Sequence, residues 1–167
     1  AQTLTDLVPT ALQPCVCVAN KKPCDLCCGN LCFLDQGICV KLIPKKGETA
    51  TALALDSCIF TDSLKKCDGL FVLKQASQVF LALIELKGSY VDDAYAQIAY
   101  VRSQRTEYAD LVKHLSEIVA NRRQIREQAF IITTSAIDRR TQQKLETSYG
   151  IRPRIITIGK PASSAPD

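Results

Sequence analysis

The chain has 167 residues, 47% hydrophobic and 23% charged, a balance typical of a globular protein of one domain with a small appended module. Its net charge of +4 is only mildly basic and does not by itself identify a polyanionic partner. No apolar stretch is long enough to cross a bilayer, so we expect no membrane partner. The first residues, AQTLTDLVPTALQPC, lack the basic start and apolar middle of a signal peptide, although a signal removed earlier would leave no trace.

Residues 1–46 form a cysteine-rich head, because seven of the nine cysteines lie between Cys15 and Cys39. The stretch TLTDLVPTAL predicts a short helix that Thr3 or Thr5 could cap. After it, frequent Pro, Gly and Asn residues predict short turns and hairpins rather than long elements.

Residues 47–160 predict a compact α/β unit, and residues 161–167 a flexible tail. Three strands come first: ALALDSCIF, CDGLFVLK and, after the turn QASQ, VFLALIELK, which is apolar enough to be buried on both faces. One long helix is expected over residues 89–120, with Ser89 as its N-cap, because its apolar residues repeat every three or four positions. The strand QAFIITTSA, a helix ended by Gly150 and the strand RPRIITIGK follow.

Three charged residues are expected to meet at one edge of this sheet. Glu85 and Lys87 are two apart in a strand, so they share a face. Folding the second and third strands about Ala76 and Ser77 as an antiparallel hairpin brings Asp68 beside them. The alternatives are an exposed Glu85–Lys87 ion pair and a turn role for Asp68 ahead of a glycine.

Two carboxylates at one point repel each other unless a cation lies between them, and hard oxygen ligands suit Mg²⁺ or Mn²⁺. A lysine beside such an ion can orient an attacking water and stabilise charge on a phosphate. Asp68, Glu85 and Lys87 therefore indicate hydrolysis of a phosphodiester.

The motifs CDG (67–69), IELKG (84–88) and AYAQIAY (94–100) resemble the PD-(D/E)XK nuclease superfamily over roughly residues 50–135. The resemblance implies a restriction-endonuclease-like mixed sheet flanked by helices, with a core of helix, three strands, helix and strand. It also implies metal ligation by Asp68, Glu85 and the Leu86 carbonyl, catalysis by Lys87, and support from Gln97 with Tyr100 nearby. Gln97 could equally be an ordinary polar helix position. A further acidic ligand would be Glu48 or Asp56, and the sequence leaves that choice open.

The clustered cysteines favour metal ligands or reduced thiols over a pure disulfide framework, because their number is odd and no export signal is visible. We therefore expect a cytoplasmic protein. Cys24 and Cys27 have the two-residue gap of a zinc knuckle, and Cys32 and Cys39 could complete a structural Zn²⁺ site. Cys15 and Cys17 could also complete it, and disulfides or plain buried thiols are equally open. Cys58 and Cys67 are expected to be small core side chains.

The function predicted from these features is a magnesium-dependent DNA nuclease that works as a homodimer, with restriction or phage defence as its role by analogy. The basic residues expected to contact DNA gather in the second half: Arg102, Arg105, Lys113, Arg122, Arg123, Arg126, Arg139, Arg140, Lys144, Arg152 and Arg154. One alternative is a catalytically inactive nuclease-fold module that binds nucleic acid or protein and has a zinc-binding head. Another is a secreted, disulfide-bonded toxin nuclease. His114 is predicted to be a surface helix residue.

Overall fold

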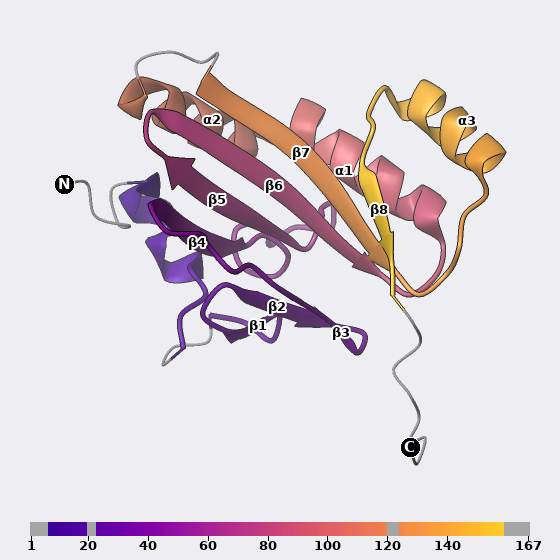
Figure 1. Cartoon of the computed structure of the whole chain (residues 1–167), viewed down its shortest axis with the longest axis horizontal. Helices are drawn as coiled ribbons and strands as arrows, with labels where there is room; N and C mark the ends of the chain where they lie inside the picture. Colours follow the sequence, from indigo (N-terminus) through magenta and orange to yellow (C-terminus); the bar gives the residue numbers. More distant parts are fainter. Residues whose placement is uncertain (1–6, 20–22, 120–123, 159–167) are drawn as a thin grey trace.

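A computed structural model describes residues 7–19, 23–119 and 124–158. Its centre is a five-stranded mixed sheet in the order β4-β5-β6-β7-β8, called here the main sheet (Figure 1). The strands are β4 (Glu48–Ala54), β5 (Gly69–Gln75), β6 (Gln78–Lys87), β7 (Ile125–Thr133) and β8 (Arg154–Thr157). Strands β4, β5 and β6 are antiparallel neighbours, whereas β7 is parallel to β6 and β8 is parallel to β7. The predicted α/β class is confirmed.

The hairpin expected between the second and third predicted strands is present. Gln75 pairs with Gln78, and the turn between them places Ala76 at a positive φ of 52°. The first predicted strand was wrong at both ends, because β4 begins at Glu48 and ends at Ala54. Beyond Ala54 the chain turns, with a bridge between Asp56 and Phe60, and a disulfide holds this turn to the segment before the head sheet.

The single long helix predicted over residues 89–120 is two helices, α1 (Val91–Gln104) and α2 (Thr106–Ile118). Arg105 interrupts them with extended backbone angles. Its guanidinium is buried, donates to both carboxylate oxygens of Asp62 at 2.6 and 2.8 Å, and lies 4.3 Å from the centroid of the Phe60 ring. Because the helix breaks at Arg105, the buried guanidinium of this residue can bind Asp62 in the β4–β5 loop. Local helix propensity does not predict this tertiary contact.

The ends of the helices match the sequence only in part. Ser89 does not cap α1, since the residue before the helix is Tyr90 in the left-handed region. Helix α3 (Arg139–Tyr149) begins after Asp138, whose carboxylate accepts from the backbone N–H of Thr141 at 2.8 Å. It ends at Gly150, which has a φ of 67°, as the sequence predicted.

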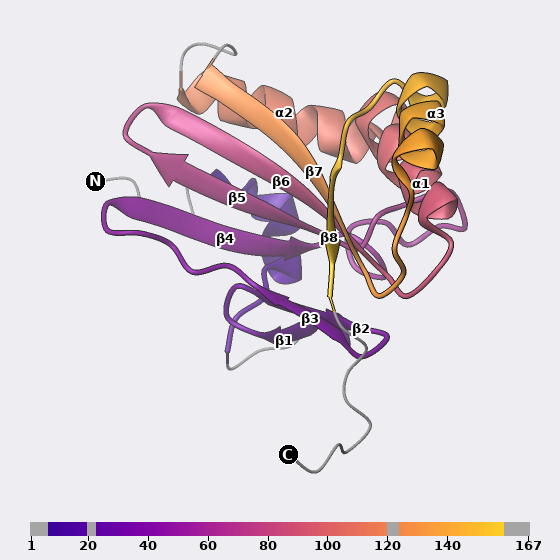
Figure 2. The same ribbon diagram turned by 45° about the vertical axis from the view of Figure 1, so that its right-hand side comes forward.

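Two apolar layers lie on opposite faces of the main sheet. Strand alternation sends Leu81 and Leu83 toward the helices and Ala82 and Ile84 toward the head. The head contributes a second sheet, in the order β1-β2-β3, that packs against the face opposite the helices (Figure 2). Its strands are β1 (Cys27–Gly29), β2 (Cys32–Asp35) and β3 (Ile38–Lys41).

Phe33 of β2 joins the two sheets. Its ring lies 4.7 Å, centroid to centroid, from that of Phe71, and a Cβ added to Gly69 would meet the ring at 2.5 Å. Gly69 therefore leaves the space that the Phe33 ring fills, and the head lies directly over the start of β5.

Six of the nine cysteines are paired, in the disulfides Cys15–Cys58, Cys17–Cys27 and Cys28–Cys32. Cys67 is fully buried, as predicted, but the prediction for Cys58 as a core thiol was wrong because it lies in the turn after β4 and bonds to Cys15. The predicted N-terminal helix falls partly outside the described residues, as do its expected caps Thr3 and Thr5, and a short 3₁₀ helix, η2 (Thr10–Cys15), covers its last residues. The tail at 161–167 also lies outside them. Among the described residues, no helix is both long and apolar enough to cross a membrane.

Candidate functional site

Asp68 and Glu85, called here the carboxylate pair, lie side by side where β5 begins and β6 ends. Gly69 pairs with Ile84, so the antiparallel register continues to Asp68 and Glu85 as the next two residues. The backbone N–H of Asp68 donates to the Ile84 carbonyl at 3.1 Å, and that of Leu86 donates to Asp68 Oδ2 at 2.7 Å. Both side chains are buried, with exposed fractions of 5% and 3%. The hairpin therefore brings the two carboxylates together inside the protein.

Lys87 follows on the same face of β6 and is half-buried. Its ammonium donates to Gln97 Oε1 across a distance of 3.4 Å, and Gln97 lies on α1. The four side chains picked from the sequence are thus gathered between the end of β6 and the first turns of α1. Tyr100, which the resemblance placed near Gln97, lies with its ring centroid 5.8 Å from the Arg105 guanidinium.

Burial raises the pKa of both members of the carboxylate pair and so favours their neutral forms. Desolvation raises the pKa of Asp68 to about 6, and the nearby Asp35 and Asp56 add to that rise, while hydrogen bonds from Leu86 and Glu85 oppose it. The pKa of Glu85 is raised well above its ordinary value, first by burial and then by the charge of Asp68. Glu85 Oε2 is buried with no hydrogen-bond partner within the described part of the chain.

A cavity of about 320 Å³ opens at Asp68 and is called here the acidic pocket. Three further carboxylates line it: Asp25 and Asp35 from the head and Asp56 from the turn after β4. Asp56 also donates its backbone N–H to the Asp68 carbonyl at 3.1 Å. Glu48, the other acidic candidate, lies at the opposite end of β4, where it pairs with Gln75. Of the two residues left open by the sequence, Asp56 is the one beside the carboxylate pair.

Sequence reasoning missed Asp25 and Asp35. Each belongs to the head, and only the packing of Phe33 against the main sheet brings them to a pocket whose other aspartates lie more than 20 positions later in the chain. No local pattern marks such residues, since an isolated aspartate beside a turn is ordinary.

The donor set fits a hard divalent cation. Asp68 and Glu85 are buried carboxyl groups with raised pKa values, and one of them has an unpartnered oxygen. A cation between them would favour their ionised forms. Oxygen ligands without nitrogen or sulfur favour Mg²⁺ or Mn²⁺ over softer ions. Asp68 and Glu85 would hold the ion, and Asp56 faces the same pocket.

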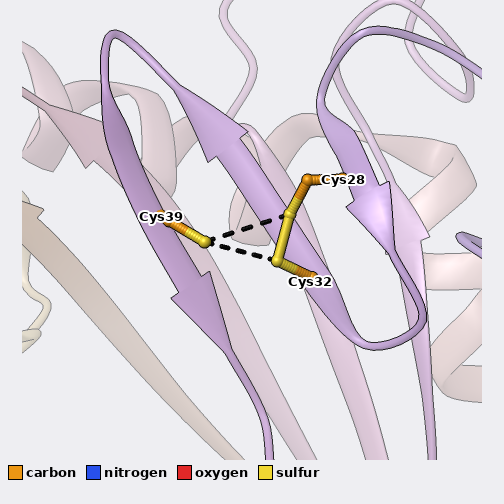
Figure 3. A group of neighbouring side chains, drawn as sticks. All are labelled: Cys28, Cys32 and Cys39. Atoms are coloured by element: carbon orange, nitrogen blue, oxygen red, sulfur yellow. Dashed lines mark hydrogen bonds between the residues drawn. A yellow bond between two sulfur atoms is a disulfide. The ribbon is translucent and has the colours of Figure 1, made fainter.

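A second group with metal-binding potential lies in the head and is called here the sulfur trio. The sulfur atoms of Cys28, Cys32 and Cys39 all lie within 4.8 Å of one another, close enough to hold a metal ion (Figure 3). Cys32 and Cys39 belong to the zinc set expected from the sequence. Cys28 was passed over because the two-residue gap pointed to its neighbour.

The other two predicted zinc ligands lie elsewhere. Cys27 is bonded to Cys17 and is fully buried in the core of the head, so it does not belong to the sulfur trio. The Cys24 sulfur lies 4.0 Å from the Asp56 carbonyl at the rim of the acidic pocket. The structure thus does not assemble the predicted set of four, because Cys27 faces the core of the head whereas Cys28, one residue later, faces outward.

The predicted DNA-contacting residues divide into two groups. Arg105 is buried and bound to Asp62, and Arg102 forms an ion pair with Glu127 at 3.5 Å, so neither presents a free charge. Arg122 and Arg123 lie outside the described residues. The remaining basic residues are exposed: Lys113, Arg126, Arg139, Arg140, Lys144, Arg152 and Arg154. His114 is half-buried on α2 rather than fully at the surface.

Comparison of the chain with protein-family models, curated proteins and solved structures finds no match.

Proposed function

We propose that the protein is a divalent-metal-dependent nuclease of the PD-(D/E)XK type that hydrolyses phosphodiester bonds in DNA. The observation that supports this most strongly is the carboxylate pair with Lys87 beside it. Buried like charges are costly, and a purely structural role would be served better by apolar side chains. A hairpin of β5 and β6 followed by α1 and the parallel strand β7 also has the strand order that the resemblance implies.

In this proposal Asp68 and Glu85 hold the cation, together with the backbone carbonyl of Leu86. A bound Mg²⁺ would supply Lewis acidity, polarising the scissile phosphate and lowering the pKa of a water. Asp68 is kept in place by the backbone N–H of Leu86. Burial raises the pKa of Glu85 well above its ordinary value, so this carboxyl would release a proton to solvent on binding a cation.

Lys87 then acts on the substrate side. Its ammonium orients the attacking water and neutralises charge on the phosphate, since a lysine is a compact cation with three rotatable donors. Gln97 accepts from this ammonium at 3.4 Å and so limits its freedom before the substrate arrives. The exposed basic residues of the second half would bind the DNA backbone, with affinity falling as salt rises.

A plasmid-nicking assay with Mg²⁺, Mn²⁺ or chelator tests the proposal. We expect nicking with either metal and none with chelator. Lys87→Ala should abolish cleavage while leaving DNA binding intact, and Lys65→Ala, which removes an exposed lysine of the β4–β5 loop, is the matched control. The enzyme proposal fails if the parent protein cleaves nothing under any divalent metal, or if Lys87→Ala cleaves as well as Lys65→Ala. Linear product formed in one encounter would support the proposed dimer.

One observation favours a second candidate, a binding module that has lost cleavage. Four aspartates line the acidic pocket, and without cations their field repels a phosphate backbone. In that case the pocket recognises a cation or a basic peptide. Calorimetric titrations with a polylysine peptide, in chelator and in Mg²⁺, separate the two candidates: the enzyme proposal predicts that Mg²⁺ abolishes any such binding, and peptide binding that persists in Mg²⁺ supports the module.

The three disulfides bear on location. Disulfides persist in oxidising compartments, whereas the sequence predicts a cytoplasmic protein with reduced thiols. Thiol titration of the unfolded chain purified from its natural source separates the two: three reactive thiols support the disulfide-bonded nuclease, and nine support the cytoplasmic one.

A further inference from the structure

The sulfur trio is built by the register of the head sheet. Strand alternation turns Phe33 into the core, so its neighbour Cys32 faces the other way. Cys39 pairs with Leu34 and therefore lies diagonally across from Cys32 on the same face. A register shift between Cys27 and Gly29 brings Cys28 to the same place. Three strands thus each deliver one sulfur to one spot.

The trio can be reached from solvent. Cys39 is exposed and Cys28 is half-buried, so a reductant or a metal ion has access. Figure 3 shows the Cys39 sulfur pointing at the Cys28–Cys32 bond. Its distances to the sulfurs of Cys32 and Cys28 are 3.3 and 3.9 Å.

These distances do not describe a thiol placed for disulfide exchange. In-line attack on one sulfur would leave the second sulfur farther away by the full S–S bond of about 2 Å. Here the two distances differ by far less, so Cys39 approaches the bond from the side. Three sulfurs arranged around a common point are instead the arrangement of a thiolate metal site.

The distances also match thiolate ligation. In a tetrahedral site with Zn–S bonds of about 2.3 Å, neighbouring sulfurs lie about 3.8 Å apart. The two separations that involve Cys39 fall on either side of that value. Only the bonded pair, Cys28 and Cys32, must separate, and the hairpin turn at Asn30 and Leu31 between them allows that movement.

We propose that Cys28, Cys32 and Cys39 form a redox-gated site for a thiophilic cation, Zn²⁺, that is closed by the Cys28–Cys32 disulfide and opened by its reduction. A dithiol reductant supplies two electrons and two protons, the S–S bond becomes two thiols, and the reductant becomes a disulfide. Zn²⁺ then binds the three sulfurs and displaces their protons to the solvent. A disulfide oxidant reverses the sequence and expels the metal. Three protein ligands leave the fourth position of the ion open to water or an added ligand.

The site is independent of the proposed nuclease activity. The trio lies on the outer face of the head, and none of its sulfurs lines the acidic pocket. Loss of nuclease activity in a test of the carboxylate pair therefore leaves this proposal unchanged.

Cobalt titration of the full-length protein tests the proposal. The protein is reduced with a phosphine, desalted without oxygen and titrated with Co²⁺, whose thiolate complexes absorb strongly in the near ultraviolet. We expect the thiolate band to saturate at one equivalent of Co²⁺ in the reduced protein, Zn²⁺ to abolish it, and the unreduced protein to show no such band, whatever Co²⁺ the carboxylate pair binds. Cys39→Ser should lose the thiolate band, and Cys24→Ser, which removes a thiol outside the trio, should keep it.

A second measurement guards against misfolded variants. Zn²⁺ should slow alkylation of Cys28, Cys32 and Cys39 in the reduced parent protein, read by mass spectrometry, and leave Cys24 alkylated at its original rate. The proposal is overturned if the reduced parent shows no thiolate band, if Cys24→Ser loses the band as completely as Cys39→Ser, or if Zn²⁺ protects Cys24 and not the trio.

Discussion

The carboxylate pair and the sulfur trio are both places where side chains converge on one point, but the chain builds them in different ways. Asp68 and Glu85 meet because one hairpin with a tight turn fixes the register of two neighbouring strands. The trio depends on three short strands, a register shift and the choice among several cysteine pairings. A site made by a single register can be read from sequence, whereas a site made by competing pairings cannot.

The two regions also differ in what secures them. Hydrogen bonds of the strand ladders hold the main sheet together, and its faces are covered by the helices and the head. The head is small, and its disulfides supply part of the stability that a larger apolar core would give. Variants that perturb one region at a time should show whether the main sheet depends on its strand ladders and the head on its disulfides.

The largest stability effect is expected from Cys15→Ser. The Cys15–Cys58 disulfide spans 43 residues and closes the longest loop of the three, so chain entropy predicts a loss of about 4 kcal/mol in the free energy of unfolding. Cys28→Ser opens a loop across only four positions and should cost about half as much. Urea unfolding of both variants under non-reducing conditions measures the difference. Equal losses would mean that loop length does not set how much each disulfide contributes to stability.

A smaller effect of opposite sign is expected from Asp68→Asn. Burial raises the pKa of Asp68 to about 6, so in the metal-free parent its ionisation opposes folding fully above pH 6 and not at all below its ordinary pKa near 3.8. Asparagine keeps an oxygen for the Leu86 N–H but carries no charge. We predict that the variant is more stable than the parent by about 3 kcal/mol at pH 7.

The pH dependence is the check on that prediction. The gain of Asp68→Asn should shrink as the pH falls through 6 and vanish near pH 4, because the parent then carries a neutral carboxyl as well. Urea unfolding at the two pH values, with chelator present, measures it. A gain that does not change with pH would mean that the charge of Asp68 is not what opposes folding.

The smallest effect tests the contact between the regions. Gly69→Ala would bring a methyl group within 2.5 Å of the Phe33 ring, so the head must shift, at a cost of about 1–2 kcal/mol. Gly88→Ala, whose nearest neighbour is the mobile end of Gln36 at 3.4 Å, is the matched control and should change stability little. Thermal unfolding compares them, and an unchanged midpoint for Gly69→Ala would mean that the head does not pack tightly over β5.

The same comparison explains what could be predicted from the sequence. Alternation in β6 and the short turn at Ala76 were enough to place Glu85, Lys87 and Asp68 together. The break at Arg105 was not predictable, because it accompanies an ion pair between the buried Arg105 guanidinium and Asp62, 43 positions earlier, and the apolar repeat continues through it. The contribution of Asp25 and Asp35 to the acidic pocket was hidden for the same reason, since it depends on how the head packs.

The cysteines show most clearly what could not be predicted from the sequence. The spacing of Cys24 and Cys27 predicted a zinc knuckle, but this spacing does not record which face each side chain occupies in a bulged strand. Cys27 faces the core and pairs with Cys17, and Cys28 faces outward with Cys32 and Cys39. Seven thiols within 25 positions allow many arrangements, and only the three-dimensional register selects among them.

Manganese binding measured by electron paramagnetic resonance tests the central idea most directly, namely that Asp68 and Glu85 exchange their shared proton for a divalent ion. We predict one tight Mn²⁺ that Mg²⁺ displaces and whose affinity rises with pH, because the raised pKa values of Asp68 and Glu85 make protons compete with the ion. Asp68→Asn and Glu85→Gln should each remove it, and Glu48→Gln, at the far end of β4, should keep it. Tight binding that persists in both carboxylate-pair variants, or an affinity that does not respond to pH, would contradict the account.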